Sequence, residues 1–82
     1  MLPFLRRPPA VLEEAPPVRM LPRLKAIRED RAFSQEDLGR LAGINPDTVG
    51  RIEGGKPAQP RTIRKLAEAL GVTPRQLMGL DD

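Results

Sequence analysis

The sequence predicts an all-α fold of five short helices, preceded by a proline-rich extended arm. Apolar residues recur at intervals of three and four from residue 20 onward, and residues that cap helices stand where these stretches begin. Six of the ten prolines lie within residues 1–22, where they disfavour both a helix and a central strand. We therefore expect residues 1–20 to be a flexible arm and residues 21–80 to form one helical domain.

The first helix is expected to follow the apolar residues Met20, Leu24 and Ile27. Pro22 suits its first turn, because a proline at that place has no N–H that would be left unpaired. This helix is expected to end at about Arg31.

The second helix is expected to begin at Gln35. Ser34 is a good N-cap, and Asp37, three positions later, is an acidic partner for the helix start. Phe33 and Leu38 flank the cap as a hydrophobic staple. The apolar residues expected on the inner face of this helix are Leu38, Leu41 and Ala42.

The third helix repeats this pattern after a connection of about three residues. Asn45 is its N-cap, Pro46 takes its first position, and it runs to about Glu53. Gly43 stands where the chain must reverse direction, a place that commonly needs left-handed backbone. The residues expected to face inward are Val49 and Ile52, with Ile44 and Val49 as the staple. Residues 34–53 thus have the form of a helix-turn-helix.

The last two helices follow residues 54–59, which are a loop by composition. Pro60 opens the fourth helix and Gly71 ends it. Thr73 caps the fifth helix, where Gln76 completes a capping box. The residues of these two helices that are expected to face the core are Ile63, Leu66, Ala67, Leu70, Leu77 and Leu80.

Composition excludes most classes of enzyme. The chain has 82 residues, which is room for one small domain. It contains no cysteine and no histidine, so thiol nucleophiles, disulfides, zinc fingers and histidine-based acid–base chemistry are excluded. Adjacent carboxylates such as Glu36 and Asp37 are expected to be solvated, because neighbours on a helix point in different directions. We expect no catalytic residue, metal or cofactor, and a net charge of +3 permits nucleic acid as a partner.

The sequence also bears on location and on the arm. No stretch approaches the roughly 18 apolar residues of a membrane span, and prolines interrupt the start of the chain too soon for a signal peptide. We expect no membrane partner and a cytoplasmic, nucleoid-associated location. Arg6 and Arg7 of the arm could lie against DNA or be solvated. The arm residues that could instead dock on a partner protein are Val11, Leu12 and Val18.

Five stretches, taken in order, resemble a known family. They are Ile27 to Asp30, Ser34 to Leu38, Gly43-Ile44, Arg51 to Lys56 and Leu66 to Val72. From Leu24 to Gly79 the chain resembles the lambda-repressor and Cro-type helix-turn-helix family, also called the xenobiotic-response-element (XRE) type. The resemblance implies a compact five-helix DNA-binding domain with its third helix in the major groove. It also implies a dimer on a two-fold related operator and a role in transcriptional control.

The resemblance assigns roles to several side chains outside the third helix's reading face. Arg28 and Glu53 match the family's partly buried ion pair, which is structural. Gln35 matches a residue that hydrogen-bonds a DNA phosphate, and its place at a helix N-terminus suits an anion. The other residues expected to contact phosphates are Asn45, Lys56 and Arg61.

Base reading is expected from the exposed face of the third helix. The residues on that face are Pro46, Asp47, Thr48, Gly50 and Arg51. Arg51 suits a guanine, and Thr48 suits a thymine methyl or a phosphate. Asp47 could accept a hydrogen bond from cytosine or merely favour the positive helix N-terminus. Pro46 cannot donate and Gly50 has no side chain, so affinity per half-site is expected to be modest.

The sequence therefore predicts a sequence-specific regulator of transcription, a repressor that binds double-stranded DNA as a homodimer. Two other hypotheses stay open. An antitoxin of a toxin–antitoxin pair, which also regulates its own promoter, would use residues 1–20 to cover a protein partner. A helix-turn-helix module for protein–protein interaction would account for the weak reading residues Pro46, Asp47 and Gly50.

Overall fold

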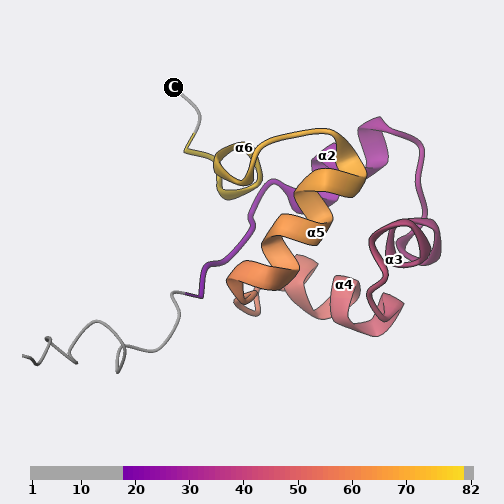
Figure 1. Cartoon of the computed structure of the whole chain (residues 1–82), viewed down its shortest axis with the longest axis horizontal. Coiled ribbons are helices and arrows are strands. Elements are labelled where there is room, and N and C mark those ends of the chain that lie inside the picture. The colour runs from indigo at the N-terminus through magenta and orange to yellow at the C-terminus, as the bar shows by residue number, and fades with distance from the viewer. Residues whose placement is uncertain (1–17, 81–82) are drawn as a thin grey trace, which may run out of the picture.

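The computed structural model describes residues 18–80. Residues 1–17, 81 and 82 lie outside this range, and with them most of the arm expected over residues 1–20, including Arg6, Arg7, Val11 and Leu12. The helices are α2 (Leu24–Asp30), α3 (Gln35–Ala42), α4 (Pro46–Glu53), α5 (Pro60–Leu70) and α6 (Pro74–Met78). Figure 1 shows α5 in the middle of the domain, with the other helices around it. The predicted all-α fold of five helices is confirmed over this range.

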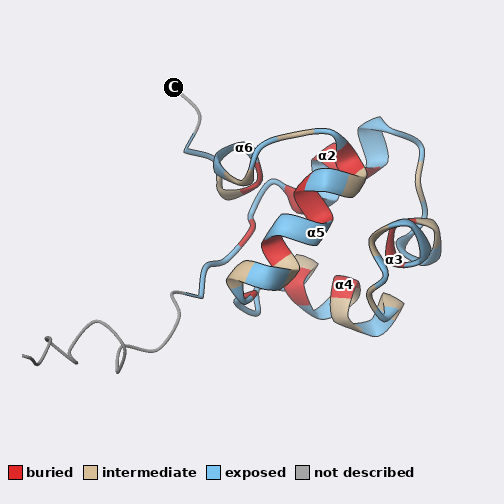
Figure 2. Cartoon of the chain, viewed as in Figure 1, coloured by how far each residue is buried: buried red, intermediate tan, exposed pale blue. Residues whose placement is uncertain are grey.

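One hydrophobic core holds the helices together. Figure 2 shows that the buried faces of the helices point toward the centre of the domain, while their outer faces are exposed. Twelve apolar residues form this core: Leu21, Leu24, Ile27, Leu38, Val49, Ile52, Ala58, Ile63, Leu66, Ala67, Leu70 and Leu77. Four of them belong to α5, at intervals of three, one and three residues, so one face of that helix is wholly buried.

The predicted helix starts are confirmed by their hydrogen bonds. The Ser34 hydroxyl accepts from the Asp37 N–H at 2.9 Å, and the Asp37 carboxylate accepts from the Ser34 N–H at 2.9 Å. Thr73 and Gln76 form the same reciprocal pair at the start of α6. The Asn45 side chain accepts from the Asp47 N–H at 2.8 Å, with a proline at the first position of α4. Each box satisfies backbone donors that a helix leaves unpaired at its start.

The predicted start of the first helix is wrong. Met20 is 60% exposed and lies before the helix, which begins at Leu24. The chain turns at Pro22 and Arg23, where the Leu24 N–H donates to the Leu21 carbonyl at 3.0 Å. The turn places Leu21 in the core at 2% exposure, in the place that the helical pattern had given to Met20.

An isolated bridge holds the chain before this turn against the loop between α4 and α5. The Arg19 N–H donates to the Ala58 carbonyl at 3.0 Å, and the Ala58 N–H donates to the Arg19 carbonyl at 2.7 Å. Pro60, two residues after Ala58, has no N–H to donate to such a ladder.

Two further predictions of inward-facing residues are wrong. Leu41 is 59% exposed, because the buried face of α3 is centred between Leu38 and Gly39, and Leu41 lies on the far side of Leu38. Leu80 is 51% exposed, because α6 ends at Met78 and Gly79 turns the chain with a φ of 77°. Among residues 18–80, no helix is long and apolar enough to cross a membrane.

Candidate nucleic-acid interface

A close approach at Gly39 sets the angle between α3 and α4. The connection consists of Gly43, Ile44 and Asn45, and Gly43 has the predicted left-handed backbone with a φ of 72°. A Cβ atom on Gly39 would lie 2.5 Å from the carbonyl oxygen of Ile44 and 3.2 Å from the nitrogen of Pro46. Only a glycine lets α3 come this close to the start of α4. Sequence reasoning did not single out Gly39, since the contact is with the backbone of another element.

One face of α4 packs inward and the opposite face is open. Val49 is fully buried and Ile52 is 4% exposed, so these two residues anchor the helix. The predicted reading residues all lie outside the core. Asp47 and Arg51 are exposed, whereas Pro46, Thr48 and Gly50 are half-buried.

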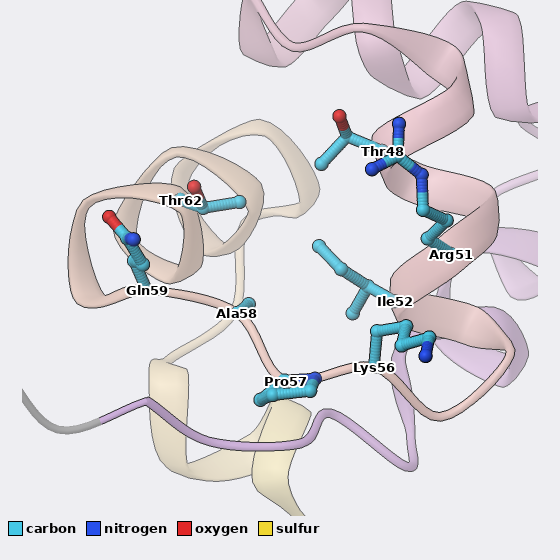
Figure 3. A pocket seen from close by; sticks show the side chains of 8 residues that line it. All are labelled: Thr48, Arg51, Ile52, Lys56, Pro57, Ala58, Gln59 and Thr62. Carbon is cyan, nitrogen blue, oxygen red and sulfur yellow. The ribbon is translucent and has the colours of Figure 1, made fainter.

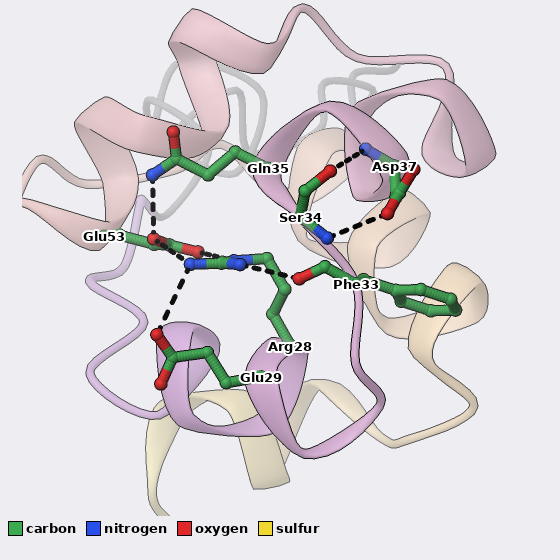
Figure 4. A network of polar contacts seen from close by, with 7 residues as sticks. All are labelled: Arg28, Glu29, Phe33, Ser34, Gln35, Asp37 and Glu53. Atoms are coloured by element: carbon green, nitrogen blue, oxygen red, sulfur yellow. Dashed lines mark hydrogen bonds and ion pairs between the residues drawn. The ribbon is translucent and has the colours of Figure 1, made fainter.

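Arg28 joins three parts of the domain (Figure 4). Its guanidinium donates to both carboxylate oxygens of Glu53, at 2.5 Å and 3.1 Å, and to the carbonyl of Phe33 at 2.7 Å. The side chains of Arg28 and Glu53 are 9% and 5% exposed. The pair therefore links α2 to the last residue of α4 away from water.

Gln35 is attached to the same network. Its Nε2 donates to Glu53 Oε1 at 3.0 Å, so the amide reaches across from the start of α3 to the end of α4 (Figure 4). A Cβ atom on Gly50 would lie 3.4 Å from Oε1 of Gln35, which shows that the Gln35 side chain lies over Gly50. The contact between Gln35 and Glu53 was not expected from the sequence, because 18 residues separate the two.

The network shifts the pKa values of Arg28 and Glu53 in opposite directions, and both shifts favour the charged form. Burial raises the pKa of Glu53, but hydrogen bonds from Arg28 and Gln35 and the charge of Arg28 together outweigh burial, so the pKa lies below its ordinary value. The hydrogen bond to Glu53 raises the pKa of Arg28 against the opposing effect of burial. Both groups are therefore ionised at neutral pH. The network is a fixed support for α4 and holds no proton to exchange.

A cleft of about 450 Å³ separates α4 from the start of α5 (Figure 3). Thr48 and Arg51 line it from α4, and Lys56 lines it from the following loop. Gln59 and Thr62 face them from the far side. Gln59 and Thr62 were not predicted as site residues. The sequence could have indicated them, because polar residues beside the helix start at Pro60 lie near N–H groups that the helix leaves unpaired.

Two of the expected phosphate contacts lie apart from this cleft. Arg61 lines a different cavity, together with Arg64 and Lys65 of α5. Asn45 lies at the opposite end of α4, where its side-chain oxygen caps that helix. The structure thus brings Arg51, Thr48 and Lys56 together and leaves Arg61 outside the group.

Known proteins with similar sequences share the helix-turn-helix arrangement described above. Residues 22–78 match the family described as "Helix-turn-helix domain". The chain belongs to the helix-turn-helix family. Within that family it is of the XRE type, which its sequence motifs resemble.

Relatives of this helix-turn-helix chain are regulators of transcription. It is 40% identical over 57 residues to the HTH-type transcriptional repressor RghR of Bacillus subtilis, an alignment that covers 67% of this chain and 42% of RghR. It is 34% identical over 61 residues to the HTH-type transcriptional regulator PrtR of Pseudomonas aeruginosa, which covers 74% of this chain and 24% of PrtR. The chain thus spans less than half the length of these curated relatives.

Two solved structures share the helix-turn-helix fold. One is the restriction-modification controller protein C.AhdI from Aeromonas hydrophila, with 39% identity and a TM-score of 0.64 over 67% of this chain and 85% of that one. The other is the hypothetical transcription factor NHTF from Neisseria, with 29% identity and a TM-score of 0.66 over 80% of this chain and 81% of that one.

Proposed function

We propose that the chain represses transcription by binding double-stranded DNA as a homodimer, with α4 in the major groove. The observation that carries this proposal is the open face of α4. Thr48 and Arg51 lie on this face. Among residues 18–80, Arg51 forms no ion pair with an acidic side chain. On the opposite face, Val49 and Ile52 are buried in the core and hold the helix in place. A major groove about 12 Å wide admits a helix held in this way.

Arg51 is the main reading residue in this proposal. It is exposed, and a guanidinium can donate two hydrogen bonds to the O6 and N7 atoms of a guanine. Thr48, one turn earlier, offers a methyl group to thymine. Gly50 is covered by Gln35 and contributes space instead of contact. Asp47 favours the positive end of α4, where its carboxylate is close to the helix N-terminus.

Contacts to the DNA backbone would lie on both sides of α4. Gln35 uses one hydrogen of its Nε2 for Glu53, and the second hydrogen remains to donate to a phosphate. Lys56 stands at the other side, across the cleft from Gln59 and Thr62. Asn45 can donate from its amide nitrogen while its oxygen caps the helix. Arg61, on a separate cavity, is the weakest of the expected phosphate contacts.

The size of the reading helix supports the proposal of a dimer. The eight residues of α4 are about 12 Å long, so one copy can reach only a few base pairs. Two copies on half-sites about 34 Å apart would read two successive turns of one face of the duplex. The names of the repressor and regulator relatives support a role in transcription.

The test is selection of bound sequences from a random duplex pool by the purified chain, at low and near-physiological salt. The expected result is a two-fold symmetric motif, with half-sites one or more helical turns apart. Binding without any motif would overturn sequence-specific reading. An asymmetric single site would overturn the dimer.

Arg51→Ala gives a sharper test of α4. We expect it to cut the preference for the selected site over random DNA by a factor of roughly ten to a hundred, since one bidentate base contact contributes about 1–3 kcal/mol of discrimination. Arg75→Ala on α6 removes the same charge outside the cleft and should keep the preference of the original chain. Equal preference in Arg51→Ala and the original chain would remove Arg51 from the reading face.

A further inference from the structure

A second basic surface lies on α5 and α6, away from the reading residues of α4. It consists of two adjoining cavities of about 360 and 600 Å³, which share Arg64 and Pro74. Ile63 and Met78 supply apolar wall in the first cavity, and Arg19 lies at its edge. We call these two cavities the α5–α6 groove.

The cations of the α5–α6 groove have no acidic partner in the described structure. Ion pairs among residues 18–80 form at Arg28, Arg31 and Arg40 only. The groove is lined by four other cations: Arg19, Arg61, Arg64 and Lys65. Glu68 is its single acidic lining residue. An apolar floor beneath unpaired positive charge fits a ligand that is apolar and acidic together.

The chain carries such a sequence directly before the groove. Residues 10–15 read Ala-Val-Leu-Glu-Glu-Ala, with Val11 and Leu12 followed by two carboxylates. Outside this segment, residues 1–17 contain no other acidic side chain, and the remaining charges there are Arg6 and Arg7. The segment thus combines the apolar and the acidic side chains that such a groove would hold.

The point at which the described chain begins sets the reach of this segment. The bridge between Arg19 and Ala58 fixes the chain beside the start of α5, and Arg19 itself lines the groove. Glu14 is four residues before Val18, a span of at most about 14 Å, and Leu12 is six residues before it, at most about 22 Å. A segment of the same chain can therefore reach the groove without a long linker.

We propose that residues 10–15 dock in the α5–α6 groove of their own chain, with Val11 and Leu12 on its apolar wall and Glu13 and Glu14 against Arg19 and Arg64. The docked segment covers apolar surface that the half-buried Met78 otherwise leaves at the edge of the domain. Its two carboxylates also offset two of the four positive charges of the groove, whereas Arg51 and Lys56 stay the cations of the open cleft. The proposal does not depend on DNA binding.

The test is paramagnetic relaxation in the full chain, free of DNA. Because the chain has no cysteine, Ala10→Cys gives a single attachment point for a nitroxide. The methyl signal of Met78 and the amide signals of Ile63 and Arg64 should lose most of their intensity until the nitroxide is reduced. The amides of Gly39 and Gly43, on the α3 side, should keep theirs. Full intensity at Met78, Ile63 and Arg64 would overturn the proposal.

Charge variants test what holds the segment. Glu14→Lys should restore most of the lost intensity, whereas Glu36→Lys, which makes the same charge change on an exposed residue of α3, should not. Arg64→Glu should also restore intensity, and Glu14→Lys combined with Arg64→Glu should bring the loss back. Circular dichroism of each variant verifies that the domain is folded. If the loss of signal intensity were the same in Glu14→Lys, in Arg64→Glu and in the original chain, the proposal would be overturned.

A mixed sample identifies the chain that supplies the segment. Nitroxide-labelled chain without isotope is mixed with isotope-labelled chain without nitroxide. The proposal requires that the groove signals of the isotope-labelled chain keep their intensity in this mixture. A loss of intensity would show that a second copy supplies the segment, which would overturn docking within one chain.

Discussion

Gly39 and Gly50 are both glycines inside helices, but the space around them differs. A Cβ atom on Gly39 would meet the backbone of the turn at 2.5 Å, and backbone cannot move aside without shifting α4. A Cβ atom on Gly50 would meet only the flexible end of the Gln35 side chain, at 3.4 Å. Gly39 therefore serves close packing of two elements, whereas Gly50 leaves room for one side chain.

Alanine substitutions at these two glycines should have opposite effects on stability. Alanine within a helix is about 1 kcal/mol more favourable than glycine. We therefore expect Gly50→Ala to stabilise the folded domain by up to about 1 kcal/mol. At Gly39 we expect a net loss of about 1–3 kcal/mol, because overpacking outweighs the gain. Chemical denaturation of Gly39→Ala and Gly50→Ala measures both, and a Gly39→Ala variant as stable as the original would contradict the close approach.

At the residue scale, the caps were the features that sequence predicted best. Ser34 and Thr73 bond to residues three positions away, so their partners stand within the same short stretch. Leu41 was assigned to the wrong face because helical spacing from Leu38 alone cannot tell on which side the buried face is centred. The close approach at Gly39 decides that, and it involves atoms from beyond the turn.

Between elements, the strongest polar connection is that of α2 with the end of α4. Arg28 and Glu53 are 25 residues apart in sequence, and only the resemblance to known regulators pointed to their pairing. Removing one partner of a buried pair leaves the other charge without compensation. The orientation of α4, and hence of Arg51, depends on this pair as well as on the core.

We expect Glu53→Gln to destabilise the domain by about 3 kcal/mol near neutral pH. Because the pKa of Glu53 in the folded chain lies below its value in the unfolded chain, its contribution is fully present above the unfolded pKa of about 4.3. It is lost as the pH falls through the folded pKa. The difference in unfolding free energy between the original chain and Glu53→Gln should therefore narrow in acid. A difference independent of pH would contradict this assignment.

The matched control replaces both partners of the pair. Arg28→Met with Glu53→Met leaves no buried charge, so it should cost less than Glu53→Gln alone. Some acid sensitivity should persist in both variants. Hydrogen bonds from Ser34, first from its backbone and then from its side chain, hold the pKa of Asp37 below its ordinary value, and Asp37 is unchanged in either variant.

At the scale of the domain formed by residues 18–80, two surfaces that carry basic side chains lie apart from each other. Arg51 and Lys56 line the cleft beside α4, whereas Arg61, Arg64 and Lys65 belong to the α5–α6 groove. The net charge of +3 could not distinguish these surfaces, because it says nothing about where the charges lie. The family resemblance grouped Arg61 with Lys56 as phosphate contacts, but Arg61 lies in the first turn of α5 and lines a different cavity.

The salt dependence of DNA binding should separate the two surfaces. If Lys56 contacts a phosphate, Lys56→Ala should lower the slope of log affinity against log salt concentration by about one, equally for all sequences. Arg64→Ala should leave the slope unchanged, because in our proposal its surface faces the chain's own acidic segment. Binding measured by fluorescence anisotropy over a series of salt concentrations gives both slopes. A smaller slope for Arg64→Ala would place DNA on the α5–α6 groove.

The bridge between Arg19 and Ala58 also determines how a mechanical load would enter the domain. It precedes every described helix along the chain, and Ala58 lies two residues after Lys56. Tension applied through residues 1–17 would therefore reach the loop between α4 and α5 before it reaches α2. Two short hydrogen bonds side by side would carry that tension together, at 3.0 Å and 2.7 Å. Anything that captures the N-terminal side of the chain thus pulls first on the loop that carries Lys56.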